Sequence, residues 1–269
     1  MLSLVWAESE SVTATDRGLS YGDGLFETIR VHDQQPVLGA RHLARLLYGA
    51  ERLGIPLAAA ELGASLEQAL ARYAGPDDWV LKLVLTRGVG GRGYVPPSAC
   101  QPTLIISRHD LPPPPDPSGV SVQLARHPVV ANSALAGLKT LNRLDQVIAG
   151  SELRSGNYEV LLTDGRGHLL EGSRTNILAK VAGEWWLPPM SELAVHGVML
   201  AEVVERLRAA GETVRERVLP VSILVRTELE GMFLTNSVVG VIPVCRVDCR
   251  DLPIEHSLAT ICRPLISLK

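Results

Sequence analysis

The run Ala136-Gly137-Leu138-Lys139-Thr140-Leu141-Asn142 places a single lysine among small or apolar residues. No aspartate or glutamate lies within five residues of Lys139 on either side. Loss of solvation penalises an ammonium ion, so a lysine in apolar surroundings releases its proton more readily. The neutral amine can then bond to a carbonyl carbon or abstract a proton. Because most such lysines extend to the surface, the run alone leaves both interpretations open.

The composition is that of an ordinary globular protein. Hydrophobic residues make up 46% of the chain and charged residues 20%. Its 269 residues are enough for one large domain or two modest ones. The formal net charge of −3 argues against a nucleic-acid partner. The first ten residues lack the basic region of a secretion signal, and no apolar stretch reaches membrane-spanning length. We therefore expect a cytoplasmic protein that does not bind a membrane.

The cysteines give no sign of a metal site. They are Cys100, Cys245, Cys249 and Cys262, with no CxxC pair and no histidine near Cys245 and Cys249 at zinc-ligand spacing. We expect buried or unreactive thiols, as suits a reducing cytosol.

A proline-rich segment divides the chain. Residues 111–119 contain five prolines in nine positions, a composition that favours a stiff, extended connection. We predict an N-terminal α+β domain over 1–110, this linker, and a larger C-terminal domain over 120–269 that carries Lys139.

Periodicity before the linker predicts a mixture of strands and helices. Residues 25–32 alternate as a strand, with Phe26 and Thr28 on one face and Glu27 on the other. Residues 41–53 carry leucines at helical spacing and predict an amphipathic helix.

Two further helices are expected from capping and periodicity. Ser65, with a glutamine three residues later, matches a capping box and predicts a helix that begins there. Residues 141–153 predict a helix with Leu144, Val147 and Ile148 facing inward.

The rest of the chain after the linker alternates short β-rich segments with turns. Asp164-Gly165-Arg166-Gly167 predicts a hairpin, and a second turn follows at Ala182-Gly183. Residues 198–210 predict a strong helix. Hairpins followed by single helices indicate an α+β fold with a mostly antiparallel or barrel-like sheet.

Several polar residues lie where they could contact a ligand. Arg45 borders the leucine stripe of its helix, where a guanidinium could bind phosphate or simply remain solvated. Glu171 directly follows two leucines and could be a partly buried acid or an ordinary strand-edge carboxylate. Val198 and Met199 open a helix, and the backbone N–H groups of a helix start can bind an anion.

Three further segments have the same ambiguity. Thr235-Asn236-Ser237 separates two β-rich segments and could form a turn or donate to a ligand. The segment 87–94, RGVGGRGY, could be a solvated surface loop or a gate in which Arg92 pairs with a carboxylate. Residues 17–28 are a glycine-rich approach to a strand, most simply a loop and hairpin, and do not match a Rossmann fingerprint.

Taken together and in order, these segments resemble the fold-type IV pyridoxal-phosphate enzymes. The resemblance extends from Asp16-Arg17-Gly18 to Ile242-Pro243-Val244. It implies a two-domain α+β fold, with a small N-terminal α/β sandwich and a larger C-terminal pseudo-barrel domain. It also implies pyridoxal 5'-phosphate as the cofactor and no metal.

The resemblance implies a role for each matched residue. Lys139 would hold the cofactor covalently and transfer the proton, and Glu171 would pair with the pyridine nitrogen, where a carboxylate keeps the ring an effective electron sink. Thr28 would assist the leaving group. The other cofactor-binding positions would be Arg45, Asn176, Val198, Met199 and Ser237, and the substrate-binding positions would be Arg92, Tyr94 and Asn236.

Within this family, the loop 87–94 and the run 138–147 are most similar to aminodeoxychorismate lyases. Such an enzyme converts 4-amino-4-deoxychorismate to 4-aminobenzoate and pyruvate, a step of folate biosynthesis. A D-amino-acid or branched-chain aminotransferase on the same scaffold is the alternative, although the loop has no Arg-x-His, expected in D-amino-acid aminotransferases. A non-catalytic binding module is the third possibility. The resemblance also implies a homodimer with a shared active site.

Overall fold

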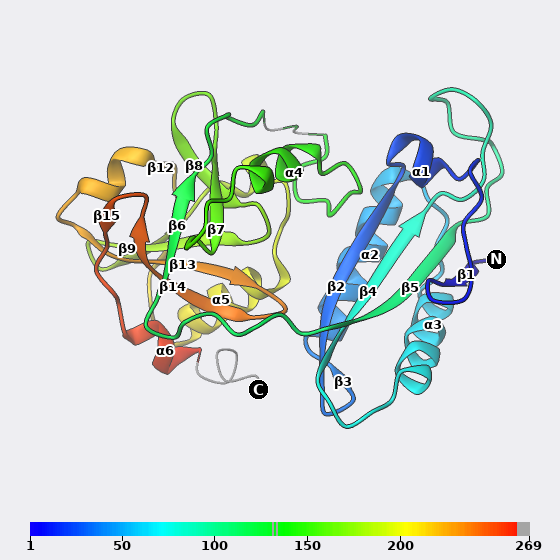
Figure 1. Cartoon of the computed structure of the whole chain (residues 1–269), viewed down its shortest axis with the longest axis horizontal. Helices are drawn as coiled ribbons and strands as arrows, with labels where there is room; N and C mark the ends of the chain where they lie inside the picture. Colours follow the sequence, from blue (N-terminus) through cyan, green and yellow to red (C-terminus); the bar gives the residue numbers. More distant parts are fainter. Residues whose placement is uncertain (131, 133, 263–269) are drawn as a thin grey trace. The chain divides into compact units, whose positions relative to one another are not determined.

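The computed structural model describes residues 1–130, 132 and 134–262, and within them the chain forms two compact units (Figure 1). The first unit comprises Met1–Pro112 together with Leu138–Asn142. The second comprises Pro113–Gly137 and the described residues from Arg143 onward. The segment that contains Lys139 therefore packs with the N-terminal unit and not with the C-terminal domain, where the position of the linker predicts it.

The first unit is a sheet with helices on one face. Its strands are β1 (Ser3–Trp6), β2 (Gly24–His32), β3 (Gln35–Pro36), β4 (Trp79–Thr86) and β5 (Thr103–Asp110). Its helices are α1 (Arg17–Tyr21), α2 (Gly39–Leu53) and α3 (Ala59–Arg72). The strand order is β1-β5-β4-β2-β3, and every pair is antiparallel except β1 with β5. In Figure 1, α2 and α3 lie behind this sheet.

Strand alternation explains which face these helices cover. On β2, Leu25 and Ile29 point to the same face as Leu83 and Leu85 of β4, and all four are almost fully buried. Leu46 on α2 is buried as well. The opposite face of β2 carries half-buried residues, so it is the more accessible one.

The second unit contains a closed barrel. Its strands are β6 (Val120–Leu124), β7 (Glu159–Thr163), β8 (His168–Gly172), β9 (Asn176–Val181), β10 (Glu184–Leu187), β11 (Val214–Glu216), β12 (Leu219–Pro220), β13 (Leu229–Asn236), β14 (Gly240–Val247) and β15 (Arg250–Asp251). Its helices are α4 (Leu144–Ser151), α5 (Val198–Ala209) and α6 (Ser257–Ile261), with short 3-10 turns η1 (Met190–Glu192) and η2 (Val221–Val225). The order β9-β13-β14-β6-β7-β8 closes because β8 also pairs with β9.

Inward-facing aliphatic residues fill the barrel. They include Leu161, Ile177, Leu234, Ile242 and Val244. The mixed α and β composition and the barrel-like sheet confirm the predicted fold class. Residues 111–119, the predicted linker, contain no helix or strand and connect β5 to β6.

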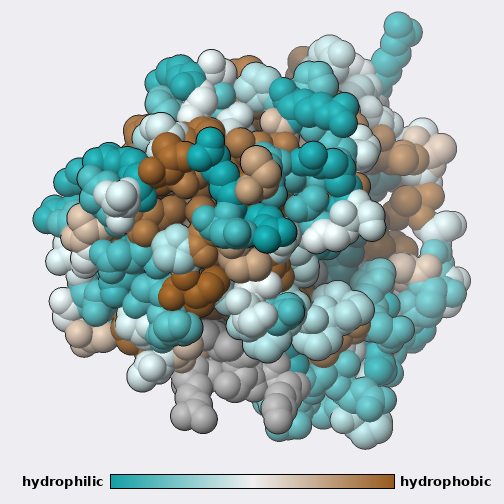
Figure 2. Space-filling view, turned by 60° about the vertical axis from the view of Figure 1, so that its left-hand side comes forward, coloured by the Kyte–Doolittle hydropathy of each residue, from teal (hydrophilic) through white to brown (hydrophobic). Residues whose placement is uncertain are grey.

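Three local predictions are wrong. Leu144, Val147 and Ile148 of α4 are 76%, 63% and 51% exposed, and the residue that packs on the sheet is Ala149, which contacts the cluster of Val160 and Leu162. A small residue at the contact lets the helix approach the sheet closely, and this turns the larger side chains outward. Brown areas among hydrophilic residues in Figure 2 show that hydrophobic residues reach the surface on this face.

The other two wrong predictions concern helix starts. Helix α3 begins at Ala59 with no side-chain cap, and Ser65 lies inside it, donating its hydroxyl to the Glu61 carbonyl. Residues 17–21, expected in a loop, form α1, whose N-cap Asp16 accepts a hydrogen bond from the Gly18 amide. Helix α1 therefore begins at a local cap, whereas α3 begins without one and buries Leu62, Ser65 and Ala69 along one side.

None of the helices in the described part of the chain combines the length and hydrophobicity needed to span a bilayer. All four cysteines are free thiols, and Cys249 is exposed. Burial raises the pKa of Cys262 to about 11, so this thiol is unreactive at neutral pH.

Candidate active site

A short segment around Lys139 pairs with the first residues of β2 as an additional strand. The Phe26 amide donates to the Lys139 carbonyl over 2.9 Å, and Thr140 forms an antiparallel bridge with Leu25. In this register Lys139 lies opposite Phe26, so the two side chains emerge on the same face. The Lys139 Nζ lies 4.2 Å from the centroid of the Phe26 ring, a favourable cation–π geometry. Backbone pairing thus fixes the face of the sheet on which the Lys139 side chain emerges.

Two further polar side chains emerge on this accessible face of the first unit. Thr28 is two residues beyond Phe26 on β2 and is half-buried, like Lys139. Lys82 on β4 pairs directly opposite Thr28. The structure therefore gathers Lys139, Thr28 and Lys82 on one face. No role was predicted for Lys82, because its place beside Thr28 becomes evident only when the pairing of two distant strands is known.

Arg45 is held by a buried carboxylate on the other face of the same sheet. The Arg45 guanidinium donates to Glu27 through Nε to Oε1 (2.7 Å) and through Nη2 to Oε2 (2.6 Å). His42 Nδ1 lies 2.6 Å from the same Oε2. Burial alone would raise the pKa of Glu27, but the hydrogen bonds from Arg45 and His42 outweigh it and hold the pKa below its usual value. Glu27 and His42, for which the sequence predicts no role, therefore fix the orientation of Arg45.

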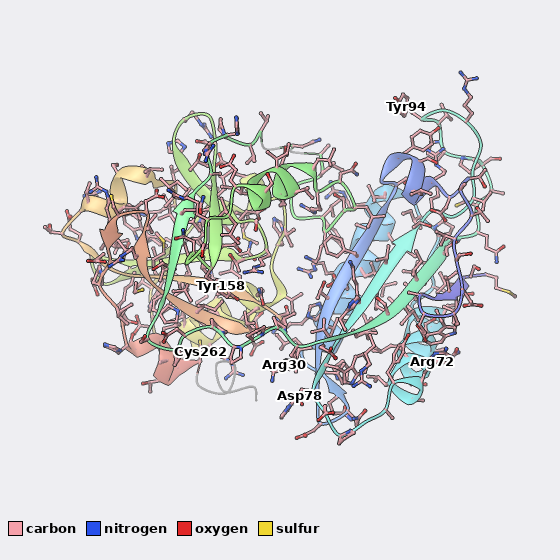
Figure 3. All side chains as sticks on the ribbon, in the orientation of Figure 1. Arg30, Arg72, Asp78, Tyr94, Tyr158 and Cys262 are labelled. Carbon is pink, nitrogen blue, oxygen red and sulfur yellow. The ribbon has the colours of Figure 1, made fainter. Side chains whose placement is uncertain are left out.

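The loop after β4 exposes the two side chains predicted to bind substrate. Arg92 is exposed, and Tyr94 is 87% exposed at the outer end of the loop (Figure 3). Arg87, the first residue of the segment 87–94, is not solvated. It is 5% exposed and donates to both carboxylate oxygens of Asp23, at 2.8 and 3.0 Å.

In the second unit, three buried polar residues form a row across neighbouring strands. Glu171 on β8 pairs with Asn176 on β9, and Asn176 pairs with Thr235 on β13. Their neighbours Ile177 and Leu234 point into the barrel core, so Asn176 and Thr235 point to the outside of the barrel. All three of the row are at most 5% exposed. A buried polar row of this kind suits a bound polar ligand.

This row contacts the loop that leads into α5. Asn176 Nδ2 donates to the Val195 carbonyl over 3.0 Å, and the Val195 amide lies 3.4 Å from Glu171 Oε2. Gly197, the residue before α5, has no room for a side chain, because a Cβ there would lie 1.9 Å from Asn176 Oδ1. Gly197 supplies no side-chain cap. Val198 and Met199 thus open a helix whose start borders the polar row.

The end of β13 continues this arrangement. Asn236 Oδ1 accepts hydrogen bonds from the Val238 and Val239 amides, at 2.9 and 3.0 Å. These hydrogen bonds make Asn236 part of a turn, which is one of the two alternatives left open by the sequence. Ser237 lies within this turn and is half-buried. Among the described residues, the buried Oγ1 of Thr235 has no hydrogen-bond partner.

The predicted residues thus fall into separate groups. Lys139 and Thr28 share a face of the first unit, Arg45 lies against its other face, and Arg92 and Tyr94 lie on the loop. In the second unit, contacts or strand pairing join the predicted residues Glu171, Asn176, Val198, Met199, Asn236 and Ser237 through Thr235, Val195 and Gly197.

The sequence profile of the family described as "Amino-transferase class IV" matches residues 24–247. The chain belongs to the class IV aminotransferase family. The matched range includes every predicted site residue, from Thr28 to Ser237. The cofactor of this family is pyridoxal 5'-phosphate.

Individual members of the class IV family are similar over nearly the whole chain. A solved 4-amino-4-deoxychorismate lyase from Pseudomonas aeruginosa is 36% identical, with a TM-score of 0.89 over 96% of this chain and 95% of that one. A putative branched-chain-amino-acid aminotransferase from Methanocaldococcus jannaschii is 31% identical over 89% of this chain and 83% of its own length. An aminodeoxychorismate lyase from Vibrio harveyi is 26% identical over 93% of this chain and 92% of its own length. The relatives thus include both lyases and aminotransferases.

The residues present fit the cofactor. The unpartnered hydroxyl of Thr235 and the uncapped start of α5 are the kind of donors that bind a phosphate group. Glu171 supplies a buried carboxylate suited to a protonated ring nitrogen. Lys139 supplies an amine on a segment that backbone pairing holds in place.

Proposed function

We propose that this class IV enzyme is a lyase that converts 4-amino-4-deoxychorismate to 4-aminobenzoate and pyruvate. The observation that carries the proposal is the 36% identity to the Pseudomonas aeruginosa lyase, over almost the full length of both chains. Thr28 adds to it, because a hydroxyl stands on the same face as Lys139, where it could assist a leaving oxygen.

In this proposal Lys139 is the base. Bound pyridoxal phosphate supplies an electron sink for the electron pair left when a proton is removed from the amine-bearing carbon. The Lys139 amine removes that proton from the substrate ring. Its position opposite Phe26 restricts its motion, and a positioned base reacts faster than a mobile one.

Thr28 acts on the leaving group. The bond between the ring carbon and the enolpyruvyl oxygen breaks, and the Thr28 hydroxyl donates a hydrogen bond to that oxygen as negative charge develops on it. The enolate that leaves then takes up a proton at carbon and becomes pyruvate, which balances the proton removed by Lys139, while the ring becomes aromatic. The atoms balance without a co-reactant, and aromatisation provides much of the driving force.

The remaining residues hold the cofactor and the substrate. Glu171 would hold the ring nitrogen, and a guanidinium, helix amides and hydroxyl groups would hold the phosphate. The cofactor residues are Arg45, Asn176, Val198, Met199, Thr235 and Ser237. The substrate carries two carboxylates, for which Arg92, Tyr94, Asn236 and Lys82 supply donors.

We also propose a homodimer with a shared active site. A second copy of the chain would cover Leu144, Val147 and Ile148, three exposed hydrophobic side chains of α4. The loop that carries Arg92 would reach the partner's site. Light scattering should give twice the 29.0 kDa chain mass, and a monomeric mass would reject this arrangement.

An aminotransferase is the second candidate, favoured by the 31% identity to the Methanocaldococcus jannaschii protein. Pyruvate detection separates the two. The lyase releases pyruvate from 4-amino-4-deoxychorismate with no keto acid added. Amino-group transfer between an amino acid and a keto acid, without pyruvate release from 4-amino-4-deoxychorismate, would instead establish the aminotransferase.

Replacing Thr28 by valine tests the leaving-group role. We expect Thr28→Val to lower the rate of pyruvate release about 10²-fold, as for loss of a general acid, while cofactor affinity is unchanged. Thr28→Ser, which keeps the hydroxyl, should retain most of the rate. Equal losses in the two variants, or a parallel loss of cofactor affinity, would argue against this role.

Replacing Glu27 by glutamine tests whether Arg45 binds the phosphate. A neutral amide orients the guanidinium less strongly, so we expect Glu27→Gln to weaken binding of pyridoxal phosphate about tenfold, the size of a charge-assisted hydrogen bond. Binding of pyridoxal, which lacks the phosphate, should be unchanged. Titration of the cofactor-free protein with each compound measures both.

The matched control is Asp78→Asn, which also removes a carboxylate that pairs with an arginine, in this case Arg30 of β2. Asp78 accepts from Arg30 over 2.7 Å, and the two residues lie side by side in Figure 3. This variant should lose stability without affecting the preference for the phosphorylated compound. If Glu27→Gln weakens both compounds equally, the pair of Glu27 and Arg45 is structural only.

A further inference from the structure

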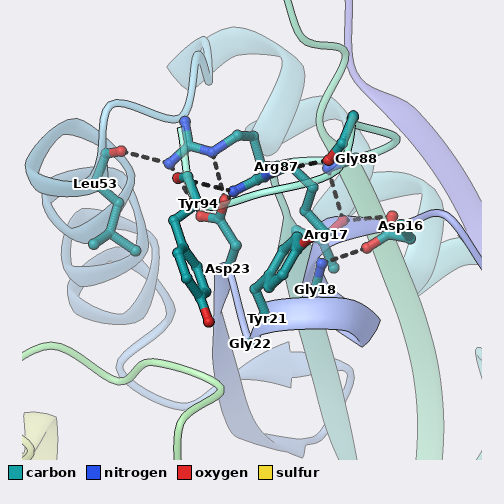
Figure 4. A network of polar contacts seen from close by, with 12 residues as sticks. Asp16, Arg17, Gly18, Tyr21, Gly22, Asp23, Leu53, Arg87, Gly88 and Tyr94 are labelled. Carbon is teal, nitrogen blue, oxygen red and sulfur yellow. Dashed lines mark hydrogen bonds and ion pairs between the residues drawn. The ribbon is translucent and has the colours of Figure 1, made fainter. Parts of the chain in front are cut away.

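A buried arginine near the N-terminus holds the backbone of the loop after β4 (Figure 4). The side chain of Arg17 is 3% exposed. Its Nη1 donates to the carbonyls of Gly91 (3.4 Å) and Gly93 (3.0 Å), and its Nη2 donates to the carbonyl of Tyr94 (3.3 Å). One guanidinium thus contacts three successive parts of a loop more than seventy residues away.

A second charged group completes this cluster. Arg17 Nε donates to Asp23 Oδ2 over 2.8 Å, and Arg87 donates to the same carboxylate. The other donors of Arg87 bind the carbonyls of Leu53 (2.7 Å) and Gly54 (2.8 Å), at the end of α2. Two buried guanidinium groups therefore share one carboxylate, and backbone carbonyls stabilise the excess positive charge.

This charge balance couples the loop to Arg17. If the loop moved away, Arg17 would lose three hydrogen-bond acceptors that protein carbonyls now supply. Tyr21 adds to the attachment, since its hydroxyl accepts from the Gly93 amide over 2.9 Å and its ring packs edge-on against Tyr94. Gly90 allows the close approach, because a Cβ there would lie 2.4 Å from Arg17 Cδ.

The side chains of the loop point outward from this fixed backbone. Arg92 is exposed, and Tyr94 is 87% exposed. A backbone held in one conformation presents such side chains without the entropy cost of ordering them at binding. The fixed backbone of the loop thus presents Arg92 and Tyr94, the two loop residues proposed to bind substrate.

We propose that Arg17 is a positioning residue that fixes the loop of residues 88–94 and thereby sets substrate affinity through Arg92. The second part rests on the proposed lyase function. Arg17 itself contacts the loop backbone and Asp23, so its effect on substrate acts through the loop. Arg87 provides a matched control, because it shares Asp23 but binds the end of α2 in place of the loop.

The first measurement is hydrogen exchange of the peptide that spans residues 88–95, which needs no activity. Arg17→Gln should speed exchange in this peptide about tenfold or more, as expected for loss of a charge-assisted hydrogen bond. Arg87→Gln should leave it near the wild-type rate. Unchanged exchange in Arg17→Gln, or equal acceleration in both variants, would overturn the proposal.

The second measurement is a double-mutant cycle on pyruvate release. Arg17→Gln should raise KM about tenfold with kcat within about twofold of wild type, and adding it to Arg92→Ala should raise KM no further. Independent, multiplying effects would contradict an action through Arg92. Should Arg17→Gln fail to fold, Gly90→Ala displaces the same guanidinium from the other side and should give the same result.

The two measurements separate the two claims. Failure of the wild-type protein to release pyruvate would reject the lyase function, while the exchange data would still decide whether Arg17 holds the loop. Wild-type activity combined with an unchanged KM in Arg17→Gln and Gly90→Ala would reject the positioning role alone.

Discussion

Lys139→Ala should lower pyruvate release at least about 10³-fold, the range for loss of a catalytic base. Alanine supplies no amine to remove the proton and none to bond the cofactor. The variant should therefore also lose bound cofactor on dialysis. The fold should survive, because the strand pairing around Lys139 uses backbone groups. Rate assays and the melting temperature measure the two effects separately.

Lys82→Ala is the control for this prediction. Lys82 emerges on the same face as Lys139, opposite Thr28. It should keep covalently bound cofactor, and any loss should appear in KM, because its proposed partner is a substrate carboxylate. If Lys82→Ala lost the cofactor and Lys139→Ala retained it, the roles of the two lysines would have to be exchanged.

Glu171→Gln should lower kcat about 10²-fold or more, the size expected when a preorganised electrostatic contact is removed. A neutral amide cannot stabilise a positive charge on the ring nitrogen, so the electron sink is weaker. Because glutamine has nearly the same shape, the contact with the Val195 amide and the packing beside Asn176 should persist. The measurement is kcat at saturating cofactor.

Asp164→Asn serves as the comparison within the same hairpin. Asp164 is a buried carboxylate at the opposite end of β8, where it accepts from Arg166 and His168. Its replacement should lower stability and leave kcat per folded molecule near wild type. Equal losses of kcat in the two variants would show that Glu171 acts only through the fold.

The sequence predicted best those elements whose signals are local. The turn at Asp164-Gly165-Arg166-Gly167 joins β7 and β8 as expected, because its residues define a hairpin by themselves. Helix α5 follows its leucine and valine stripe. The resemblance to the class IV family added the site residues, which periodicity alone had left ambiguous.

The rest depended on contacts between distant segments. Nothing near Lys139 in the sequence indicates that it pairs with β2, more than one hundred positions earlier. The contact of Arg45 with Glu27 of β2 became evident only from the packing, as did the contacts of Arg17 with the loop after β4. On α4, the apolar spacing was correct for a helix, but the spacing does not say whether the apolar face meets the sheet or the surface.

Peptide mapping after borohydride reduction tests the central claim most directly. Reduction fixes pyridoxal phosphate to whichever amine holds it, and the lysines of the chain are Lys82, Lys139, Lys180 and Lys269. We predict that mass spectrometry finds the label on the peptide containing Lys139. A label on another lysine, or none on protein saturated with the cofactor, would contradict the account.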